Sequence, residues 1–306
     1  FTLLEDLGYL PRIAFNMDWL FKRAGAHGKQ ALTMAMGFGC NAAGVTACRI
    51  IDSPREKLIA ILTNNFVPCN GRFPTLIAER GGLFSASIIA TGTVVLIVLL
   101  GVLVTLLVSW GLSRTVLKGE ASAFTLELPP YRRPNITRVI YTSLIDRTIF
   151  VLLRACATAA PAGAVIWLLG NIYADGQPLS QHISEFLRPM GWLMGLDGVI
   201  LLAYIIAIPA NEIVVPTMLM AYLMQGRMIE LEEAEMASVL QAHGWTLLTA
   251  VCLMLFSLLH NPCGTTIWTI YKETHSAKWT LLGALLPLAI GILVCIVVAN
   301  AVRLVT

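Results

Sequence analysis

Residues 83–112 read LFSASIIATGTVVLIVLLGVLVTLLVSWGL, a run without a single charged side chain. A helix of about 20 apolar residues crosses the roughly 30 Å hydrocarbon core of a bilayer, so this run is long enough to span it with some tilt. The run also lacks the period-two alternation of a membrane β-strand. It therefore predicts a transmembrane α-helix.

The whole chain has the composition of an integral membrane protein. Of its 306 residues, 57% are hydrophobic and 13% are charged, and the mean hydropathy is +0.76. Such values lie outside the range of ordinary soluble domains. The net charge of +3 comes without a basic patch interleaved with aromatics, so no nucleic-acid partner is expected. We predict an all-α polytopic helical bundle in contact with the lipid bilayer.

Several other apolar segments are shorter or interrupted. Two half-length pieces cover about 31–47 and 58–67, and longer pieces cover about 149–169, 195–223, 245–259 and 279–302. Polar or helix-breaking stretches interrupt them, namely RIIDSPREK (49–57), IPANEIVVPT (208–217) and HNPCGTT (260–266). Interruptions in both halves of a chain are typical of inverted-repeat transporters. We therefore expect broken or re-entrant helices that form two gate regions.

Charge divides the chain into three parts. Residues 112–148 carry an excess of arginine, which predicts a cytoplasmic linker with an amphipathic helix from about Asn135. Residues 1–111 would then form the first gate region and the first full span. Residues 149–306 would form the second gate region and the C-terminal spans. Within this last part, the polar residues 170–191 are expected to form an external loop.

The seven cysteines fall into two groups. Their odd number and irregular spacing favour reduced thiols over a disulfide framework. Four lie in unbroken apolar stretches, where a thiol packs as a small hydrophobic group: Cys48, Cys156, Cys252 and Cys295. The other three follow a glycine or a proline, where a helix cannot continue normally: Cys40, Cys69 and Cys263.

Thiols at helix breaks suggest a metal path. Unwound backbone persists at membrane depth only where protein covers it or where it lines a water-filled path. Sulfur ligands suit soft or borderline metals, which predicts a divalent transition metal as the cargo. The alternative is that Gly-Cys and Pro-Cys steps merely let helices approach closely.

Polar residues at the same breaks strengthen the metal hypothesis. Asn41 adjoins Cys40, Glu212 lies inside an otherwise uncharged span, and Glu5 and Asp6 lie in the apolar opening segment. A carboxylate at the centre of a membrane costs about 2.5–3.5 kcal/mol and usually serves a function. Glu212 could instead pair with an arginine of the bundle, Arg49 or Arg72. Glu5 and Asp6 could instead lie at the membrane interface.

Catalytic signatures are missing from the sequence. It contains no G-x-x-x-x-G-K-[ST] loop, so this chain has no P-loop, and it contains neither H-E-x-x-H nor C-x-x-C. The stretch KETH (272–275) is expected to be a polar connection. We assign no catalytic residue and no permanently bound cofactor. A cysteine nucleophile is disfavoured because no histidine adjoins Cys40 or Cys69.

Five stretches together resemble a known family. They are LEDLGYLPRIAF (4–15), GFGCNAAGVTACR (37–49), NNFVPCNGRFP (64–74), LELPPYRRP (126–134) and NPCGTTIWTIYKETHSAKW (261–279). In this order they resemble the membrane domain of the bacterial ferrous iron transport protein B family. The resemblance covers nearly the whole chain.

The resemblance implies a multi-pass protein of the bacterial inner membrane that takes up Fe²⁺. A GTP-binding domain, which would precede Phe1, would gate the path and bind GTP and Mg²⁺. A small cytoplasmic accessory protein and other copies of the chain are the implied partners. Cys40 and Cys69 would be the gate cysteines, Cys263 the late Pro-Cys, and Glu5 and Asp6 the acidic pair of the opening motif.

The chain departs from this family at two motifs. Ala43 stands where the first gate commonly has a proline, and GRFP (71–74) stands where Ala-Arg-Leu-Pro is common. The first break then rests on Gly37, Gly39 and Gly44. Another divalent metal, such as Mn²⁺ or Zn²⁺, is an alternative cargo. A nucleoside-like solute is a further alternative, because the gate architecture resembles that of nucleoside-recognition proteins.

Overall fold

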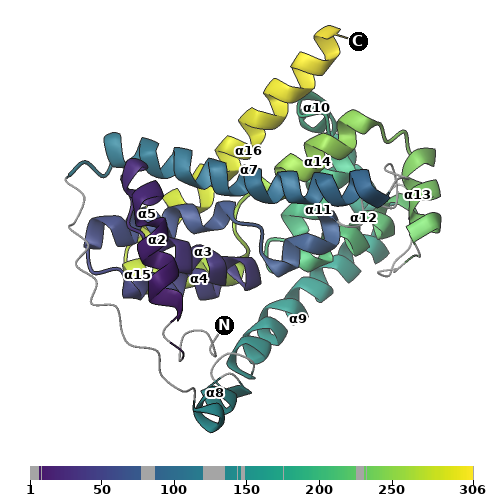
Figure 1. Ribbon diagram of the computed structural model, residues 1–306. Helices are drawn as coiled ribbons and strands as arrows, with labels where there is room; N and C mark the ends of the chain where they lie inside the picture. Colours follow the sequence, from purple (N-terminus) through teal and green to yellow (C-terminus); the bar gives the residue numbers. More distant parts are fainter. Residues whose placement is uncertain are drawn as a thin grey trace. The chain divides into compact units, whose positions relative to one another are not determined.

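A computed structural model gives the arrangement of the helices (Figure 1). It describes residue 7 and residues 9–76, 87–119, 135–142, 144–145, 149–174, 176–224, 231 and 233–305. The chain forms two compact units that interleave along the sequence. Unit 1 comprises Phe1–Cys69, Gly101–Ala157 and Thr265–Gly283, and unit 2 comprises Asn70–Leu100, Thr158–Gly264 and Ala284–Thr306. The division of the chain into three parts at residues 111 and 148 stays a prediction.

Long apolar helices confirm the predicted membrane fold. Helices α7 (Ser87–Arg114), α9 (Phe150–Asn171) and α16 (Ala277–Val305) are long and unbroken (Figure 1). Among the described residues, three stretches are long and apolar enough to cross a membrane: Gly92–Arg114, Leu247–Thr274 and Ala277–Leu304. A bent pair, Leu179–Leu193 with Gly198–Ile206, would make a fourth if it counts as one span. The chain is an all-helical membrane protein.

Unit 1 is built on short helices. Its elements are α2 (Tyr9–Arg23), α3 (Gln30–Gly39), α4 (Asn41–Ala47), η1 (Cys48–Ile50), α5 (Pro54–Thr63), η2 (Asn64–Phe66), α8 (Ile136–Thr142) and most of α15 (Gly264–Thr274). Helix α5 begins where a capping side chain and a proline predict a start, since the Ser53 side chain accepts from Glu56 N and Pro54 is the first helical residue. Its core joins Val45, Cys48, Ala60, Ile61 and Ile270.

Unit 2 holds the larger core. Its further elements are η3 (Asn70–Arg72), the strands β1 (Tyr173–Ala174) and β2 (Gln177–Pro178), α10 (Leu179–Leu193), α11 (Gly198–Ile206), η5 (Asn211–Ile213), α12 (Val214–Tyr222), α13 (Glu233–Ala242) and α14 (Leu247–Leu259). The strands form a small antiparallel hairpin with Tyr173 opposite Pro178. Fully buried Met194, Ile200, Ala203 and Leu253 belong to one apolar cluster. This cluster packs the middle of α11 against α14.

The predicted interruptions occur where the sequence places them. Helix α3 ends at Gly39 and α4 begins at Asn41, so Cys40 is the single residue between them. Helix α11 ends at Ile206 and α12 begins at Val214. Helix α14 ends at Leu259 and α15 begins at Gly264. Broken helices are therefore confirmed in both units.

Two expected loops are helical instead. Residues 170–191 form the end of α9, the hairpin and most of α10, although Pro189 and Gly191 suggest a helix end. Packing overrides propensity here, because Gly191 lies tightly against the backbone that precedes α11. The stretch KETH begins inside α15, whose last residue is Thr274. The helix extends this far because Glu273 is held by two cations of unit 1, Arg49 and Lys57.

The close contact between α10 and α11 gives the first testable prediction. A Cβ atom added at Gly198 would lie 1.9 Å from the Ser184 carbonyl oxygen, so Gly198→Ala must push the two helices apart. We expect a loss of about 1–3 kcal/mol in the free energy of unfolding in detergent micelles. Gly92→Ala is the matched control, because a Cβ there meets nothing within 4 Å. Equal stability of the two variants would contradict the described packing.

Candidate functional site

The break at Cys40 is a single residue long, and both backbone polar groups of that residue are hydrogen-bonded. Cys40 has φ −153° and ψ 123°, which is extended rather than helical. Its N–H donates to Met36 O (3.0 Å), and its carbonyl oxygen accepts from Gly44 N (3.0 Å). The Cys40 side chain is half-buried. Cys40 therefore interrupts the helix, and its backbone N–H and carbonyl oxygen still have hydrogen-bond partners.

A buried asparagine holds this break together. Asn64, which is fully buried, donates from Nδ2 to the backbone oxygen of Asn41 (3.1 Å), the first residue of α4. Its side chain fills the space above two glycines: a Cβ atom at Gly44 would lie 2.5 Å from Asn64 Nδ2, and one at Gly37 would lie 3.0 Å from Asn64 Oδ1. The glycines of this motif are thus needed for the close approach of an amide side chain.

Cys69 lies just after this asparagine in the chain. Thr63, Asn64, Asn65, Phe66 and Val67 are all buried, and Cys69 is 7% exposed. Residues 67–69 have no helical structure and lead from η2 to η3. The side chain of Asn41 is also buried, and its Nδ2 lies 3.4 Å from Asn65 Oδ1. Buried amide groups therefore tie the start of α4 to η2, the element that precedes Cys69.

In unit 2 an arginine satisfies the break before Cys263. The Arg72 guanidinium donates to the carbonyl oxygens of Leu258 (2.9 Å), His260 (3.2 Å) and Asn261 (3.5 Å). These carbonyls belong to the C-terminal end of α14, where a helix lacks internal partners. Arg72 is 1% exposed, so a cation is buried at the broken helix end. Arginine suits this role because its planar fork presents five donors.

The break between α11 and α12 lies beside this one. Gly264 N donates to Ile208 O (2.6 Å), which joins the segment of Cys263 to the interruption that precedes η5. His260 Nε2 lies 3.5 Å from Asn211 Oδ1. A Cβ atom at Gly71 would lie 3.2 Å from Glu212 Oε1, so η3 approaches η5 through its glycine. The segments that carry Glu212 and Cys263 are therefore neighbours.

Glu212 itself is exposed, and its proposed partner Arg49 is engaged elsewhere. Arg49 Nη2 lies 2.6 Å from Glu273 Oε1, and Lys57 Nζ lies 3.7 Å from the other oxygen of Glu273. Nearby in unit 1, Lys29 Nζ lies 2.6 Å from Asp52 Oδ2, and this ammonium group lowers the pKa of Asp52 below its usual range. These ion pairs link the residues just before α3 and just after η1 to each other, and link η1 and α5 to α15.

The remaining candidates are placed as follows. Glu5 and Asp6 lie outside the described residues. Within the described part of the chain, no group of three or more His, Cys, Asp or Glu side chains is close enough to hold a metal ion. Of the described candidates, Cys40 and Asn41 share one break, and Cys69, Glu212 and Cys263 lie in three other non-α-helical segments.

The other cysteines act as packing groups where they are buried. Cys48, Cys252 and Cys295 are fully buried, and Cys295 Sγ lies 3.4 Å from Cys252 O. Cys156 is exposed on α9. All seven cysteines lie in the described part of the chain and are free thiols. Secondary structure, not burial, separates the two groups: Cys40, Cys69 and Cys263 lie in non-helical residues, and the other four lie in helices.

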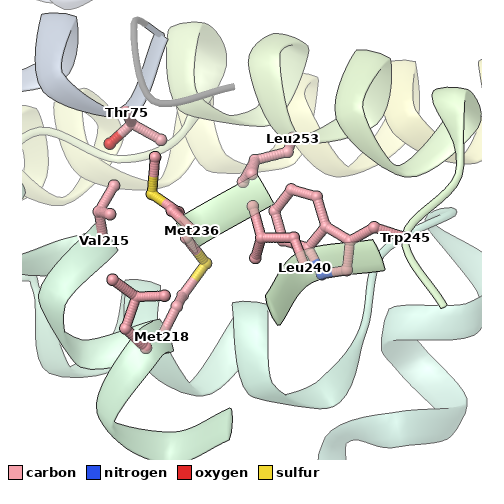
Figure 2. A pocket seen from close by; sticks show the side chains of 8 residues that line it. Thr75, Val215, Met218, Met236, Leu240, Trp245 and Leu253 are labelled. Carbon is pink, nitrogen blue, oxygen red and sulfur yellow. The ribbon is translucent and has the colours of Figure 1, made fainter. Parts of the chain in front are cut away.

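A pocket in unit 2 is apolar and does not suit a cation. Figure 2 shows its lining side chains, among them the thioethers of Met218 and Met236 and the indole of Trp245. Thr75 supplies a hydroxyl at its edge. With no charged group in its lining, the pocket is a packing defect between helices rather than part of an ion route.

Sequence reasoning missed the roles of Asn64 and Glu273 and saw Arg72 only as a possible ion-pair partner. The signal for Asn64 was the pair Asn64–Asn65 inside an apolar stretch, since buried amides must be hydrogen-bonded. The signal for Arg72 was a lone arginine beside a Pro-Cys break. Neither pattern reveals which distant carbonyl the side chain reaches.

Comparison with known families matches most of the chain. A family model described as "Gate: Nucleoside recognition" matches residues 1–83 and 152–277. A second model, described as "Ferrous iron transport protein B C terminus", matches residues 94–146. No solved structure matches the chain.

Individual relatives carry consistent names. The Fe(2+) transporter FeoB of Staphylococcus aureus (strain MSSA476) is 32% identical over 94% of this chain and 43% of its own length. The Fe(2+) transporter FeoB of Methanocaldococcus jannaschii is 29% identical over 97% of this chain and 45% of its own length. A Porphyromonas gingivalis protein, named as a fusion of Fe(2+) transport protein A and the Fe(2+) transporter FeoB, is 27% identical over 92% of this chain and 38% of its own length. The chain thus spans less than half the length of each.

The amide of Asn64 gives a second prediction. Asn64→Ala removes the donor to Asn41 O and empties the space above Gly37 and Gly44. We expect a loss of about 1–3 kcal/mol in the free energy of unfolding, because a buried hydrogen bond is lost and a cavity opens beside the two glycines. Asn70→Ala, at an exposed position, should cost much less. A melting temperature for Asn64→Ala equal to that of the control would show that the amide does not hold the break.

The guanidinium of Arg72 gives a third prediction. Arg72→Lys keeps the charge but cannot reach three carbonyls at once, so α14 loses the partners of its last turn. We expect faster amide hydrogen exchange in residues 258–264 than in the unaltered protein. The matched control is Arg49→Lys, because its ion pair with Glu273 lies at a largely exposed side chain of unit 1. Unchanged exchange in Arg72→Lys would contradict the capping role.

Proposed function

This chain belongs to the gate (nucleoside recognition) family and corresponds to the membrane region of the ferrous iron transport protein B family. We therefore propose that it is a multi-pass transporter domain that carries Fe²⁺ across the bacterial inner membrane. The names of its relatives support Fe²⁺ as the cargo. The observation that carries the proposal is the helix broken at Cys40, which presents a half-buried thiol while the N–H and the carbonyl oxygen of Cys40 remain hydrogen-bonded.

The proposed path is lined by thiols, carboxylates and an amide. Its ligands are the gate cysteines and the polar residues of the breaks: Cys40, Cys69, Cys263, Glu5, Asp6, Asn41 and Glu212. Fe²⁺ binds weakly in the Irving–Williams order, so single ligands at successive breaks hold it without trapping it. The separation of the candidates into different breaks supports passage rather than storage.

A GTP-binding domain is proposed to gate the path. That domain would bind GTP and Mg²⁺, and this chain would hold no permanent cofactor of its own. A small cytoplasmic accessory protein is a proposed partner, and the fused Porphyromonas gingivalis relative supports it. Further copies of the chain are proposed partners as well. The chain itself performs no catalysis in this account, in keeping with relatives named as transporters.

Two other cargoes remain as alternatives. A different divalent metal, Mn²⁺ or Zn²⁺, would use the same ligands, and the replacement of the usual proline by Ala43 favours an altered preference. A nucleoside-like solute is suggested by the description of the gate model. Such a solute would depend on aromatic and amide contacts, so its transport would tolerate loss of the cysteines.

Transport after cysteine replacement is the fourth prediction. We expect Cys40→Ser and Cys69→Ser each to lower anaerobic Fe²⁺ uptake into proteoliposomes by roughly tenfold or more, because a hydroxyl is a poor ligand for a borderline metal. Cys295→Ser is the control, since Cys295 is fully buried inside a helix. Mn²⁺, Zn²⁺ and a labelled nucleoside are measured in parallel. Equal losses in all three variants, or transport of the nucleoside alone, would overturn the proposal.

A further inference from the structure

Helix α10 packs on the protein through its smallest residues. Ser180, Ser184 and Gly191 are its buried positions. A Cβ atom at Gly191 would lie 2.8 Å from the carbonyl carbon of Asp197, and the Ser184 carbonyl reaches the backbone of Gly198. Small residues let two helix backbones approach closely, as they do within membranes. Ile183 and Leu187 also pack against apolar clusters of unit 2, so the apolar side chains that remain on the outside are those in the last two turns of α10.

The outside of α10 has an apolar face and a polar face. Phe186 is 82% exposed, and Met190 and Leu193 are exposed on the same side of the helix. Glu185 and Arg188 are exposed on the side between this face and the protein. Because successive helical residues are about 100° apart, Glu185 and Phe186 point to different surroundings. A protein face, a polar face and an apolar face together suit a helix at a boundary between water and lipid.

A contact with α16 fixes the depth of α10 in the membrane. Arg303, in the last turn of α16, donates to the backbone oxygen of Trp192, and its guanidinium lies 4.1 Å from the centre of the Trp192 ring. The stretch of α16 that can span a membrane ends at Leu304. Trp and Arg side chains gather where spans meet the headgroups. The C-terminal end of α10 therefore lies at the level of the membrane interface.

The angle between α10 and α11 gives the orientation of α10 relative to the membrane plane. The two helices are bent by 109° at the short break between them. If α11 runs along the membrane normal, α10 lies within about 20° of the membrane plane. Helix α9, whose end is joined to α10 by the hairpin of β1 and β2, reaches the same boundary.

We propose that α10 is an interfacial helix whose apolar face, formed by Phe186, Met190 and Leu193, contacts the acyl chains of phospholipids. Glu185 and Arg188 face the headgroups and water. Phospholipid is the occupant because the contact of Trp192 with Arg303 places α10 beside the end of the spanning stretch of α16, where Leu293 and Val297 are exposed. The proposal is independent of the transported cargo.

A photocrosslinking experiment tests this placement. The photoreactive residue p-benzoylphenylalanine replaces Phe186, Glu185 or Leu293, one at a time, in the full chain reconstituted in phosphatidylcholine and phosphatidylglycerol vesicles with alkyne-tagged acyl chains. We expect lipid adducts at position 186 within about twofold of those at position 293, and at least about fivefold fewer at position 185. Leu293 is the positive control because it is exposed on a membrane-spanning helix.

Three outcomes would overturn the proposal. Lipid adducts at position 293 without adducts at position 186 would show that the apolar face does not touch acyl chains. Crosslinks from position 186 to a second copy of the chain would show that protein covers this face. Equal lipid adducts at positions 185 and 186 would show that α10 is immersed on all sides rather than interfacial.

Discussion

Backbone that leaves a helix inside a membrane must find its hydrogen-bond partners within the protein, and the gate segments of this chain depend on that constraint. In unit 1 the N–H and the carbonyl oxygen of Cys40 are bonded to the two flanking helices, and a neutral amide, Asn64, ties η2 to the first residue of α4. Unit 2 meets it with a cation, Arg72, which reaches three carbonyls at the end of α14. Both side chains are almost completely buried. These side chains therefore hold the backbone at the breaks without using the cysteine thiols.

The two solutions differ in their electrostatics. An amide leaves the break before Asn41 neutral, so a cation that approaches Cys40 meets no fixed positive charge from the clamp. Arg72 places a positive charge beside the segment of Cys263, where Glu212 on the neighbouring η5 supplies a carboxylate.

The sequence predicted the breaks and the long spans because both follow from local rules. An uncharged run such as residues 83–112 is long enough to span, and Gly39, Pro209 and Pro262 disfavour a continuous helix. Proline alone does not decide a break, since Pro161, Pro189 and Pro287 lie inside helices. The role of Asn64 could not be predicted, because it depends on two glycines 20 and 27 residues earlier in the chain. Helix α10 was missed because its polar residues suggest a loop. In the structure its small residues pack against the protein and its aromatic residues are exposed. Long-range packing decided each of these features.

The central claim, that a thiol released by a helix break is a ligand for Fe²⁺, is tested most directly by X-ray absorption at the iron edge. Protein loaded anaerobically with Fe²⁺ should show a sulfur scatterer in the first coordination shell. That scatterer should weaken in Cys40→Ser and persist in Cys295→Ser, because Cys40 is half-buried at a break and Cys295 is fully buried within α16. An iron shell of oxygen and nitrogen alone in the unaltered protein would contradict the account.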